Sequence, residues 1–359
     1  MEHLIPHAWF EGQSQLILLL VTIVSLGIVG KGADVLVEGA AGAAFRLGMP
    51  KVIVGATIVS LGTTSPEFAV SVMAAWSGDA GLALGNAVGS VIADTGLIFG
   101  LGCLLTTLPA DKFVLSRQGW VQVGSAALLA AVCYIAWMLQ GDGAYIGRPF
   151  GVLLLLLLGA YLWISVRWAR QRQVAEDAMR ARADVAVGGE DDSVEHAAHH
   201  SLFALIAMIL GGIVMVIFSS HTLVSSVGEL ALRWGVPQVV IAASLVALGT
   251  SLPELVIGLT SLRRGHKELL VGNVIGADIL NVLFVIGGSS VAAKLPIIEH
   301  GASIPEIFLY LHLPTMLLIL FLFRIFIHSS VQRGEFKRIY GVPLLLIYLA
   351  FVAIPFFLG

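Results

Sequence analysis

The sequence predicts an all-α polytopic membrane protein whose ten transmembrane helices form two inverted five-helix repeats. Its composition, its long apolar runs and an internal repeat each point to this class. Of 359 residues, 58% are hydrophobic and only 12% are charged, too few charges to cover the surface of a soluble domain. Runs of about 18 or more apolar residues recur along the chain, and each can cross the roughly 30 Å hydrocarbon layer as a helix.

The apolar runs give ten expected spans. They cover residues 14–44, 50–76, 80–106, 117–139, 149–168, 201–232, 237–262, 268–293, 305–328 and 339–358. Residues 1–168 then form the first five-helix repeat, 169–200 a linker, and 201–359 the second repeat.

The distribution of basic residues predicts the orientation. Lysine and arginine concentrate on one set of loops, whereas the opposite set holds only Arg148, Arg233 and Lys294. The positive-inside rule makes the first set cytoplasmic. We therefore expect a multi-pass protein of the cell inner (plasma) membrane, with both termini outside and the linker 169–200 in the cytoplasm. Acidic and histidine residues in this linker could hold a metal ion, but a solvated flexible segment is the favoured interpretation; they are Asp191, Asp192, His196, His199 and His200.

An internal repeat organises the chain. The segment "RLGMPKVIVGATIVSLGTTSPEF" from Arg46 reappears as "RWGVPQVVIAASLVALGTSLPEL" from Arg233, and the match continues without a gap to Gly100 and Gly287, at a constant offset of 187 residues. Five spans separate equivalent points, and because five is odd the second copy enters the membrane from the opposite side. Inverted repeats usually meet around an ion or substrate site at mid-depth and favour alternating access.

Two equivalent motifs lie inside apolar spans, "GTTSPE" ending at Glu67 and "GTSLPE" ending at Glu254. Proline lacks a backbone N–H and leaves carbonyl oxygens without helical partners. Such oxygens are tolerated in hydrocarbon only when they face protein, water or an ion. A carboxylate at this depth normally faces a cavity or a partner. Both glutamates are therefore candidate ligands, with Thr63 and Thr250 on the same helix faces; a kinked packing helix is the alternative interpretation.

The third and eighth spans each carry one polar stripe. Residues at four-residue steps share a helix face, and the stripes consist of Asn86, Ser90, Asp94, Asn273, Ala277 and Asn281. Glycines beside the stripes permit close helix approach. Asp278 stands one position off its stripe, which favours a structural or vestibule role.

The candidate ligands are carboxylates, amides, hydroxyls and backbone carbonyls, without cysteine or histidine in the repeated motifs. Calcium takes six to eight such oxygens, whereas zinc and copper favour nitrogen and sulfur. Sodium accepts the same oxygens, so one cluster could serve both ions by competition. No HExxH motif supports an enzyme and no basic patch supports nucleic-acid binding. Ions and the lipid bilayer are the expected partners, no cofactor is expected, and the sequence is compatible with a monomer.

At these motifs the sequence resembles the calcium/cation antiporter superfamily, particularly its prokaryotic sodium/calcium exchangers. The doubled G-T-S-x-P-E pattern, within repeats spanning about residues 50–100 and 237–287, carries the resemblance. The resemblance implies a sodium/calcium exchanger-like fold in which spans 1 and 6 slide against a core of spans 2, 3, 7 and 8. It also implies secondary active exchange of Na⁺ for Ca²⁺.

The resemblance further implies a ligand set. Calcium would be held by Glu67 and Glu254, with the backbone carbonyls of Thr63 and Thr250. The sodium sites would add hydroxyls and carbonyls, and a polar pair would lie between the glutamates. These additional positions match Thr64, Ser90, Ser251, Ser60, Ala247, Asp94 and Asn281.

Two positions depart from the family pattern. Ala277 stands where a serine is usual, and Val91 stands where an asparagine commonly follows Ser90. The first departure removes a hydroxyl and puts the sodium stoichiometry in question. Proton-coupled exchange of calcium or another divalent cation therefore remains the alternative function.

Overall fold

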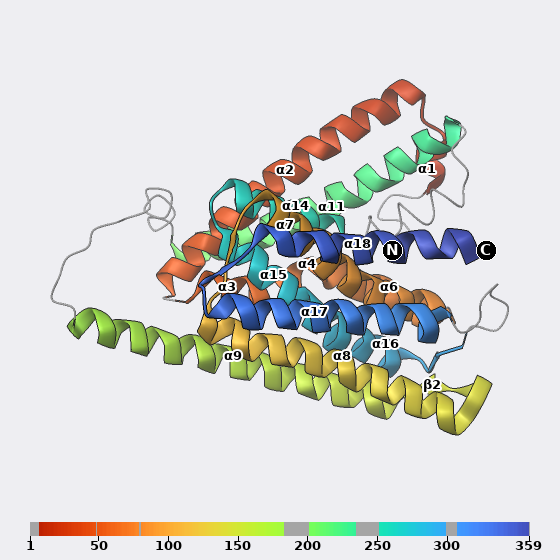
Figure 1. The fold of residues 1–359 in the computed structure, drawn as a ribbon. Helices are drawn as coiled ribbons and strands as arrows, with labels where there is room; N and C mark the ends of the chain where they lie inside the picture. The colour runs from red at the N-terminus through yellow and green to blue at the C-terminus, as the bar shows by residue number, and fades with distance from the viewer. Residues whose placement is uncertain are drawn as a thin grey trace.

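The computed structural model describes residues 7–47, 49–78, 80–182, 201–234, 251–298 and 307–358. These residues form a bundle of long helices (Figure 1). The elements of the first half are α1 (His7–Glu11), α2 (Gln15–Arg46), α3 (Lys51–Val54), η1 (Gly55–Val59), α4 (Ser60–Thr63), α5 (Ser65–Trp76), α6 (Ala80–Ala93), η2 (Asp94–Phe99), α7 (Gly100–Leu105), β1 (Leu108–Pro109), α8 (Lys112–Gln140), η3 (Gly141–Gly143), β2 (Tyr145–Ile146) and α9 (Arg148–Arg182). Those of the second half are α11 (Leu202–Arg233), α14 (Leu252–Arg263), α15 (Lys267–Leu280), η5 (Asn281–Ile286), α16 (Gly287–Ala292), β3 (Leu295–Pro296), η6 (Phe308–His312), α17 (Leu313–Val331), β4 (Glu335–Phe336), η7 (Arg338–Tyr340) and α18 (Gly341–Leu358).

The helix boundaries repeat with the sequence. Helices α2 and α11 both have 32 residues and begin 187 positions apart. Each begins after a serine whose hydroxyl accepts a backbone N–H three residues on, as Ser14 does from Ile17 and Ser201 from Ala204. This is the usual N-cap arrangement. The same offset relates α5 to α14, η2 to η5 and β1 to β3. The prediction of two equivalent halves in an all-α membrane fold is confirmed.

The membrane-crossing helices of the described residues correspond to eight of the ten expected spans. Among the described residues, seven helices are long and apolar enough to cross a membrane, and a pair broken by a 43° bend, Lys51–Thr63 with Ser65–Trp76, makes up to eight. Helix α18 corresponds to the tenth expected span, and α14 is the described part of the seventh. Helix α9 continues to Arg182, past the expected end of the fifth span at residue 168, so residues 169–182 of the expected linker are helical.

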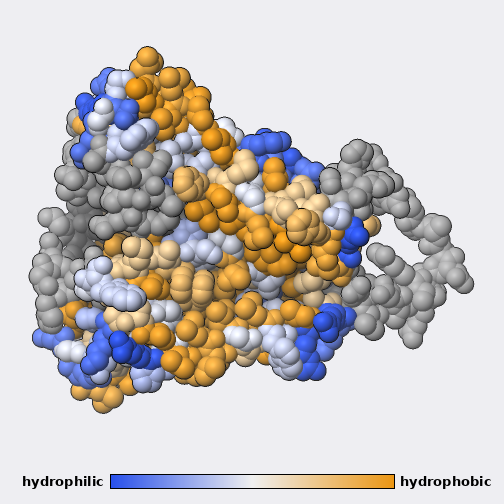
Figure 2. Space-filling model, turned by 180° about the vertical axis from the view of Figure 1, so that it is seen from behind, coloured by the Kyte–Doolittle hydropathy of each residue, from blue (hydrophilic) through white to orange (hydrophobic). Residues whose placement is uncertain are grey.

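The molecular surface carries a broad apolar zone. In Figure 2 hydrophobic residues cover the middle of the visible face, while hydrophilic residues gather toward the two ends of the helices. A 32-residue helix is about 48 Å long, which exceeds the hydrocarbon thickness. Helices α2 and α11 accordingly lie side by side at an oblique angle to the other long helices (Figure 1), as tilting of over-long spans requires.

Two short antiparallel sheets tie the halves together. Strand β1 pairs with β4 through Leu108 and Phe336, and β2 pairs with β3 through Ile146 and Leu295. Strand β1 follows the third span and pairs with a strand of the second repeat, and β3 follows the eighth span and pairs with a strand of the first repeat. The two sheets are equivalent under the repeat, which makes the halves interlock rather than fold separately.

The centre of the bundle depends on close helix crossing. A Cβ added at Gly272 would collide with the carbonyl of Val52, and one added at Gly276 with the backbone of Ala56 and the Ser60 hydroxyl. Only glycine allows α15 to approach the helix η1 and its neighbours this closely. The expected close-packing role is confirmed for Gly272 and Gly276, which bring α15 against the helix that carries the first motif; an added Cβ at Gly85 or Gly89 meets no atom of the described residues within 4 Å.

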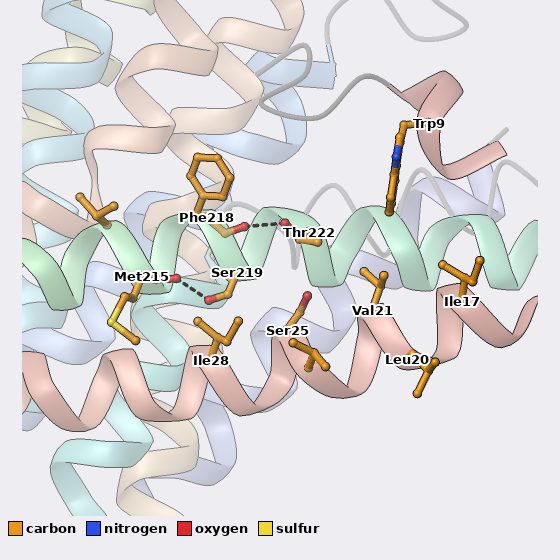
Figure 3. A pocket seen from close by; sticks show the side chains of 12 residues that line it. Trp9, Ile17, Leu20, Val21, Ser25, Ile28, Met215, Phe218, Ser219 and Thr222 are labelled. Atoms are coloured by element: carbon orange, nitrogen blue, oxygen red, sulfur yellow. Dashed lines mark hydrogen bonds between the residues drawn. The ribbon is translucent and has the colours of Figure 1, made fainter. Parts of the chain in front are cut away.

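Helices α2 and α11 also cross closely, and a groove lies between the N-terminal half of α2 and the middle of α11. Gly32 and Gly212 lie at the crossing, where an added Cβ would meet the facing helix. The groove has a volume of about 540 Å³ and is lined mainly by apolar side chains, with Trp9 over one end (Figure 3). Thr222 and Ser219 donate their hydroxyl hydrogens to carbonyls of their own helix, those of Phe218 and Met215. The groove therefore presents hydrocarbon and holds none of the predicted ligands.

Candidate cation-binding site

Both motif glutamates lie at a break in a membrane-crossing helix. Helix α4 ends at Thr63 and α5 begins at Ser65, so Glu67 falls in the first turn of α5. Glu254 occupies the same place in α14, which begins at Leu252. In both helices proline fills the first turn, where a missing N–H costs nothing. The positive end of a helix dipole favours a carboxylate in that turn, so the motif holds each acid where the backbone stabilises its charge.

The helix break changes the expected relation between threonine and glutamate. Thr63 and Glu67 were predicted to share a face of one helix, but they lie on two segments with a 43° bend between them. The Thr63 hydroxyl instead interacts with the carboxylate of Glu254, from the other repeat. It also lies 3.2 Å from the Ser60 carbonyl and 3.4 Å from Asn273 Oδ1. Thr63 therefore links the two halves at the motif.

The carboxylates are buried and their oxygens lack partners. Glu67 and Glu254 are 1% and 2% exposed, and Asp94 is fully buried. Both oxygens of Glu67, both of Asp94 and Oε2 of Glu254 have no hydrogen-bond partner among the described residues. A buried polar atom left unpaired costs about 1–3 kcal/mol, and a charged one more. This cluster therefore requires a cation or protons to be stable.

Neutral predicted ligands share this property. The hydroxyls of Thr64, Ser90 and Ser251 and Oδ1 of Asn281 are buried without a hydrogen-bond partner in the described parts of the chain. Hydroxyl and amide oxygens with free lone pairs are ligands that calcium and sodium accept. The unpaired atoms thus come from the same residues that the sequence singled out.

The three carboxylates are electrostatically coupled. Charge on Glu67 acts on Glu254, charge on Asp94 acts on Glu67, and charge on Glu254 acts on Asp94. No three acidic, imidazole or thiol groups of the described residues converge at metal-binding distances. A cation here would therefore take part of its coordination from hydroxyl, amide and backbone oxygens.

A change of helix type marks Asp94 and Asn281. The π-helical segments η2 and η5 begin at Asp94 and Asn281, which are equivalent in the repeat. A π segment shifts the side chains that follow it around the helix and is frequent at functional sites. The sequence had no signal for this irregularity beyond the polar residues themselves.

Asn86 of the polar stripe and the backbone carbonyl of Ser60 already have hydrogen-bond partners. Asn86 donates to the hydroxyl of Ser71 at 3.0 Å and to the carbonyl of Glu67 at 3.4 Å, which fixes α6 against α5. The Ser60 carbonyl accepts a bond from Thr64 N at 2.8 Å, and the Thr63 hydroxyl lies 3.2 Å from it. Because that hydroxyl has a single hydrogen, it donates either to this carbonyl or to Glu254.

Some predictions fall outside the described residues. Thr250 and Ala247 belong to residues 235–250, and the acidic and histidine residues of the linker belong to residues 183–200. Their roles stay predictions. The described site is therefore fuller on the side of the first motif than on the side of the second.

An ion-pair network in the C-terminal half of α2 was not predicted. Asp34 pairs with Arg263 at 2.5 Å and with Arg264 at 2.9 Å. Arg264 also pairs with Glu38 at 3.2 Å. The network joins α2 to the end of α14. The i, i+3 and i, i+4 spacing of the charges on α2 was the available signal, but the partners lie more than 220 positions away.

Comparisons with known proteins agree with this architecture. A sequence profile described as sodium/calcium exchanger protein matches residues 17–167 and 204–357. The chain is 28% identical over 358 residues to the sodium/calcium exchanger MaX1 of Methanosarcina acetivorans, covering 94% of this chain and 98% of that protein. It is 31% identical over 267 residues to the inner membrane protein YrbG of Escherichia coli, covering 74% of this chain and 77% of that protein.

A solved structure of the sodium-calcium exchanger NCX_Mj has the same fold. It superposes with a TM-score of 0.73 at 22% sequence identity, covering 95% of this chain and 99% of that one. The profile covers most of both repeats, including the two glutamate motifs. This multi-pass membrane protein therefore belongs to the sodium/calcium exchanger family and is built for transport of cations rather than for a chemical reaction.

Proposed function

We propose that this protein is a secondary antiporter that exchanges Na⁺ for Ca²⁺ by alternating access, with Glu67 and Glu254 as the carboxylate ligands shared by both ions. The observation that carries the proposal is the cluster of buried carboxylate and hydroxyl oxygens without partners among the described residues. Such a set suits hard cations, and its place between inverted repeats suits alternating access.

Shared ligands supply the coupling. Two coupled glutamates and Asp94 carry too much negative charge for a buried site, so the site crosses its hydrophobic barrier only when cations neutralise it. One calcium ion or several sodium ions can do this. The two kinds of ion use overlapping oxygens, so binding of one releases the other.

The proposed ligands are those that the family resemblance implies. Calcium is held by Glu67 and Glu254 with the carbonyls of Thr63 and Thr250. Sodium uses these groups together with oxygens of Thr64, Ser90, Ser251, Ser60, Ala247, Asp94 and Asn281. The tilted pair α2 and α11 is the moving element, because it packs as a unit against the core that carries the motifs.

Orientation and location complete the proposal. We place the lysine- and arginine-rich loops and the linker 169–200 in the cytoplasm, and both termini outside. The inner (plasma) membrane is the proposed location, which the 31% identity to an inner membrane protein supports. Helix α1 and the C-terminal part of α18 lie at the same end of the molecule (Figure 1), in keeping with termini on one side.

A flux measurement tests the function. Radioactive calcium uptake is measured in proteoliposomes under separately imposed sodium, potassium and proton gradients. We expect the outward sodium gradient to drive uptake and the potassium gradient to do nothing. Uptake under a proton gradient without sodium would instead support proton-coupled exchange. The alternative is kept because Ala277 offers no hydroxyl where its repeat equivalent Ser90 does.

The ion pairs of α2 give a second prediction. Arg264→Gln removes the contacts with both Asp34 and Glu38, and these groups are 20–36% exposed. Partly exposed pairs contribute about 0.2–1 kcal/mol each. We therefore expect roughly two- to thirtyfold faster amide hydrogen exchange around Asp34 and Glu38 of α2, measured by mass spectrometry.

Arg170→Gln is the matched control, since Arg170 is exposed on α9, away from this network. Added choline chloride should weaken the wild-type protection, because salt screens exposed pairs. Unchanged exchange in the Arg264 variant would show that the network does not hold α2 to α14.

A further inference from the structure

A second polar cluster lies beside the proposed transport site, centred on Asp278 of α15. Asp278 is 1% exposed. Its Oδ2 accepts hydrogen bonds from the hydroxyl of Thr95, at the start of η2, and from Nε2 of Gln122 on α8, both at 2.5 Å. The predicted structural role is thus consistent with its contacts, whereas its burial contradicts the vestibule alternative.

The cluster holds more oxygen ligands than it uses. Oδ1 of Asp278 and Oε1 of Gln122 have no hydrogen-bond partner within the described parts of the chain. Gln118 stands one turn before Gln122 on the same face of α8. It is fully buried, and neither its Nε2 nor its Oε1 is paired among the described residues. A purely structural network would satisfy these atoms.

Among the described residues, no basic side chain forms an ion pair with this carboxylate. The ion pairs of the described residues do not include Asp278. Arg324 of α17 approaches α8 at Gly119, but it stacks on Trp120, with its guanidinium carbon 4.4 Å from the ring centre. Nη1 of Arg324 is buried beside Gly119 and has no hydrogen-bond partner among the described residues, so this atom makes no hydrogen bond to Asp278.

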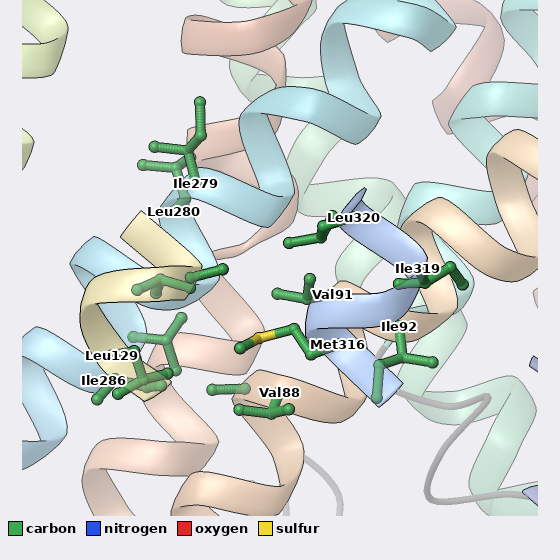
Figure 4. Packing of buried hydrophobic residues seen from close by; sticks show 14 of the residues in the cluster. Val88, Val91, Ile92, Leu129, Ile279, Leu280, Ile286, Met316, Ile319 and Leu320 are labelled. Atoms are coloured by element: carbon green, nitrogen blue, oxygen red, sulfur yellow. The ribbon is translucent and has the colours of Figure 1, made fainter. Parts of the chain in front are cut away.

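The repeat shows that the fold does not need this polar contact. In the repeat, Asp278 is equivalent to Val91 and Thr95 is equivalent to Val282, each at the offset of 187 residues. Both valines are buried in the apolar core. Figure 4 shows Val91 packed toward Met316 and Leu320 of α17. Helix α6 packs against η5 as α15 packs against η2, so the equivalent pair of elements carries two valines in one half and an acid and a hydroxyl in the other, which favours a functional reason for the polar pair.

From these observations we propose that Asp278, Thr95, Gln122 and Gln118 form a binding site for one sodium ion beside the transport site. The available ligands are carboxylate, hydroxyl and amide oxygens, which suit a hard monovalent cation. Charge on Asp278 acts on Asp94, so an ion at this site changes the electrostatic balance of the central carboxylates. The inference rests on the proposed exchange function and adds a sodium ion to it.

Equilibrium binding of radioactive sodium to the purified full chain tests the site, in calcium-free choline buffer at mildly alkaline pH. The variants are Asp278→Asn and the double change Thr95→Val with Asp278→Val, which copies the valine pair of the other half. Ser330→Ala, at a buried serine of α17, is the control. Because the site holds a single ion, we expect both Asp278 variants to bind about one fewer sodium ion per chain than the wild type and the control.

Calcium binding to each variant checks that it is folded. An equal sodium count in wild type and Asp278→Asn would overturn the sodium site. If, in addition, the Asp278→Asn protein took up fewer protons than the wild type when the pH is lowered, the carboxylate would be assigned to binding a proton instead. Failure of the exchange function would look different, because calcium bound to the wild type would then not be displaced by sodium. If the double variant does not fold, the isosteric Asp278→Asn decides the outcome.

Discussion

Replacing Glu254 with glutamine is expected to abolish sodium-driven calcium uptake, and Glu67→Gln should do the same. Each change keeps the side-chain shape but removes a unit of negative charge from a buried site. At an effective dielectric constant near 20, a contact between unit charges is worth on the order of 4 kcal/mol. For a divalent ion the loss is larger, so calcium affinity should fall by at least several hundredfold.

The measurement is calcium uptake in proteoliposomes, together with calcium binding in detergent. Glu335→Gln is the matched control, because it makes the same chemical change at an exposed glutamate of β4. We expect the control to exchange like wild type. Undiminished exchange in either motif variant would refute the role of that glutamate as a shared ligand.

Gly272→Ala is expected to destabilise the whole protein. The new Cβ would overlap the backbone carbonyl of Val52, and this contact lies where α15 crosses the first motif helix. Backbone cannot move aside as a side chain can, so the cost should reach or exceed the roughly 1–3 kcal/mol of ordinary overpacking. We expect the apparent Tm in detergent to fall by about 4 °C or more.

Gly159→Ala provides the comparison. Gly159 also lies inside a membrane-crossing helix, α9, but no atom of the described residues comes within 4 Å of its added Cβ. Alanine there should leave Tm unchanged or raise it slightly, since alanine favours helix. Equal stability of the two variants would show that the close crossing at Gly272 is not needed for the fold.

Much of the architecture could be predicted from the sequence. Apolar runs located the spans because lipid forces each segment to satisfy its own backbone hydrogen bonds. The repeat offset placed the second half, and the structure repeats even the N-caps Ser14 and Ser201 at that spacing. Glu67 and Glu254 were predicted to be ion ligands because a carboxylate inside an apolar span is too costly to be incidental.

Contacts between distant segments were decided only by the tertiary structure. Thr63 turns to Glu254 rather than to Glu67 because the helix breaks at the motif. Asp34 pairs with Arg263 and Arg264 because α2 crosses the end of α14.

The cluster at Asp278 shows the same limit. Gln118 and Gln122 were visible in the sequence only as two polar residues one turn apart in an apolar span. Their relation to Asp278 and Thr95 depends on how α8 packs beside α15 and η2. Sequence periodicity specifies which face of a helix is polar, but the partner of that face is set by helix packing, to which every helix in the bundle contributes.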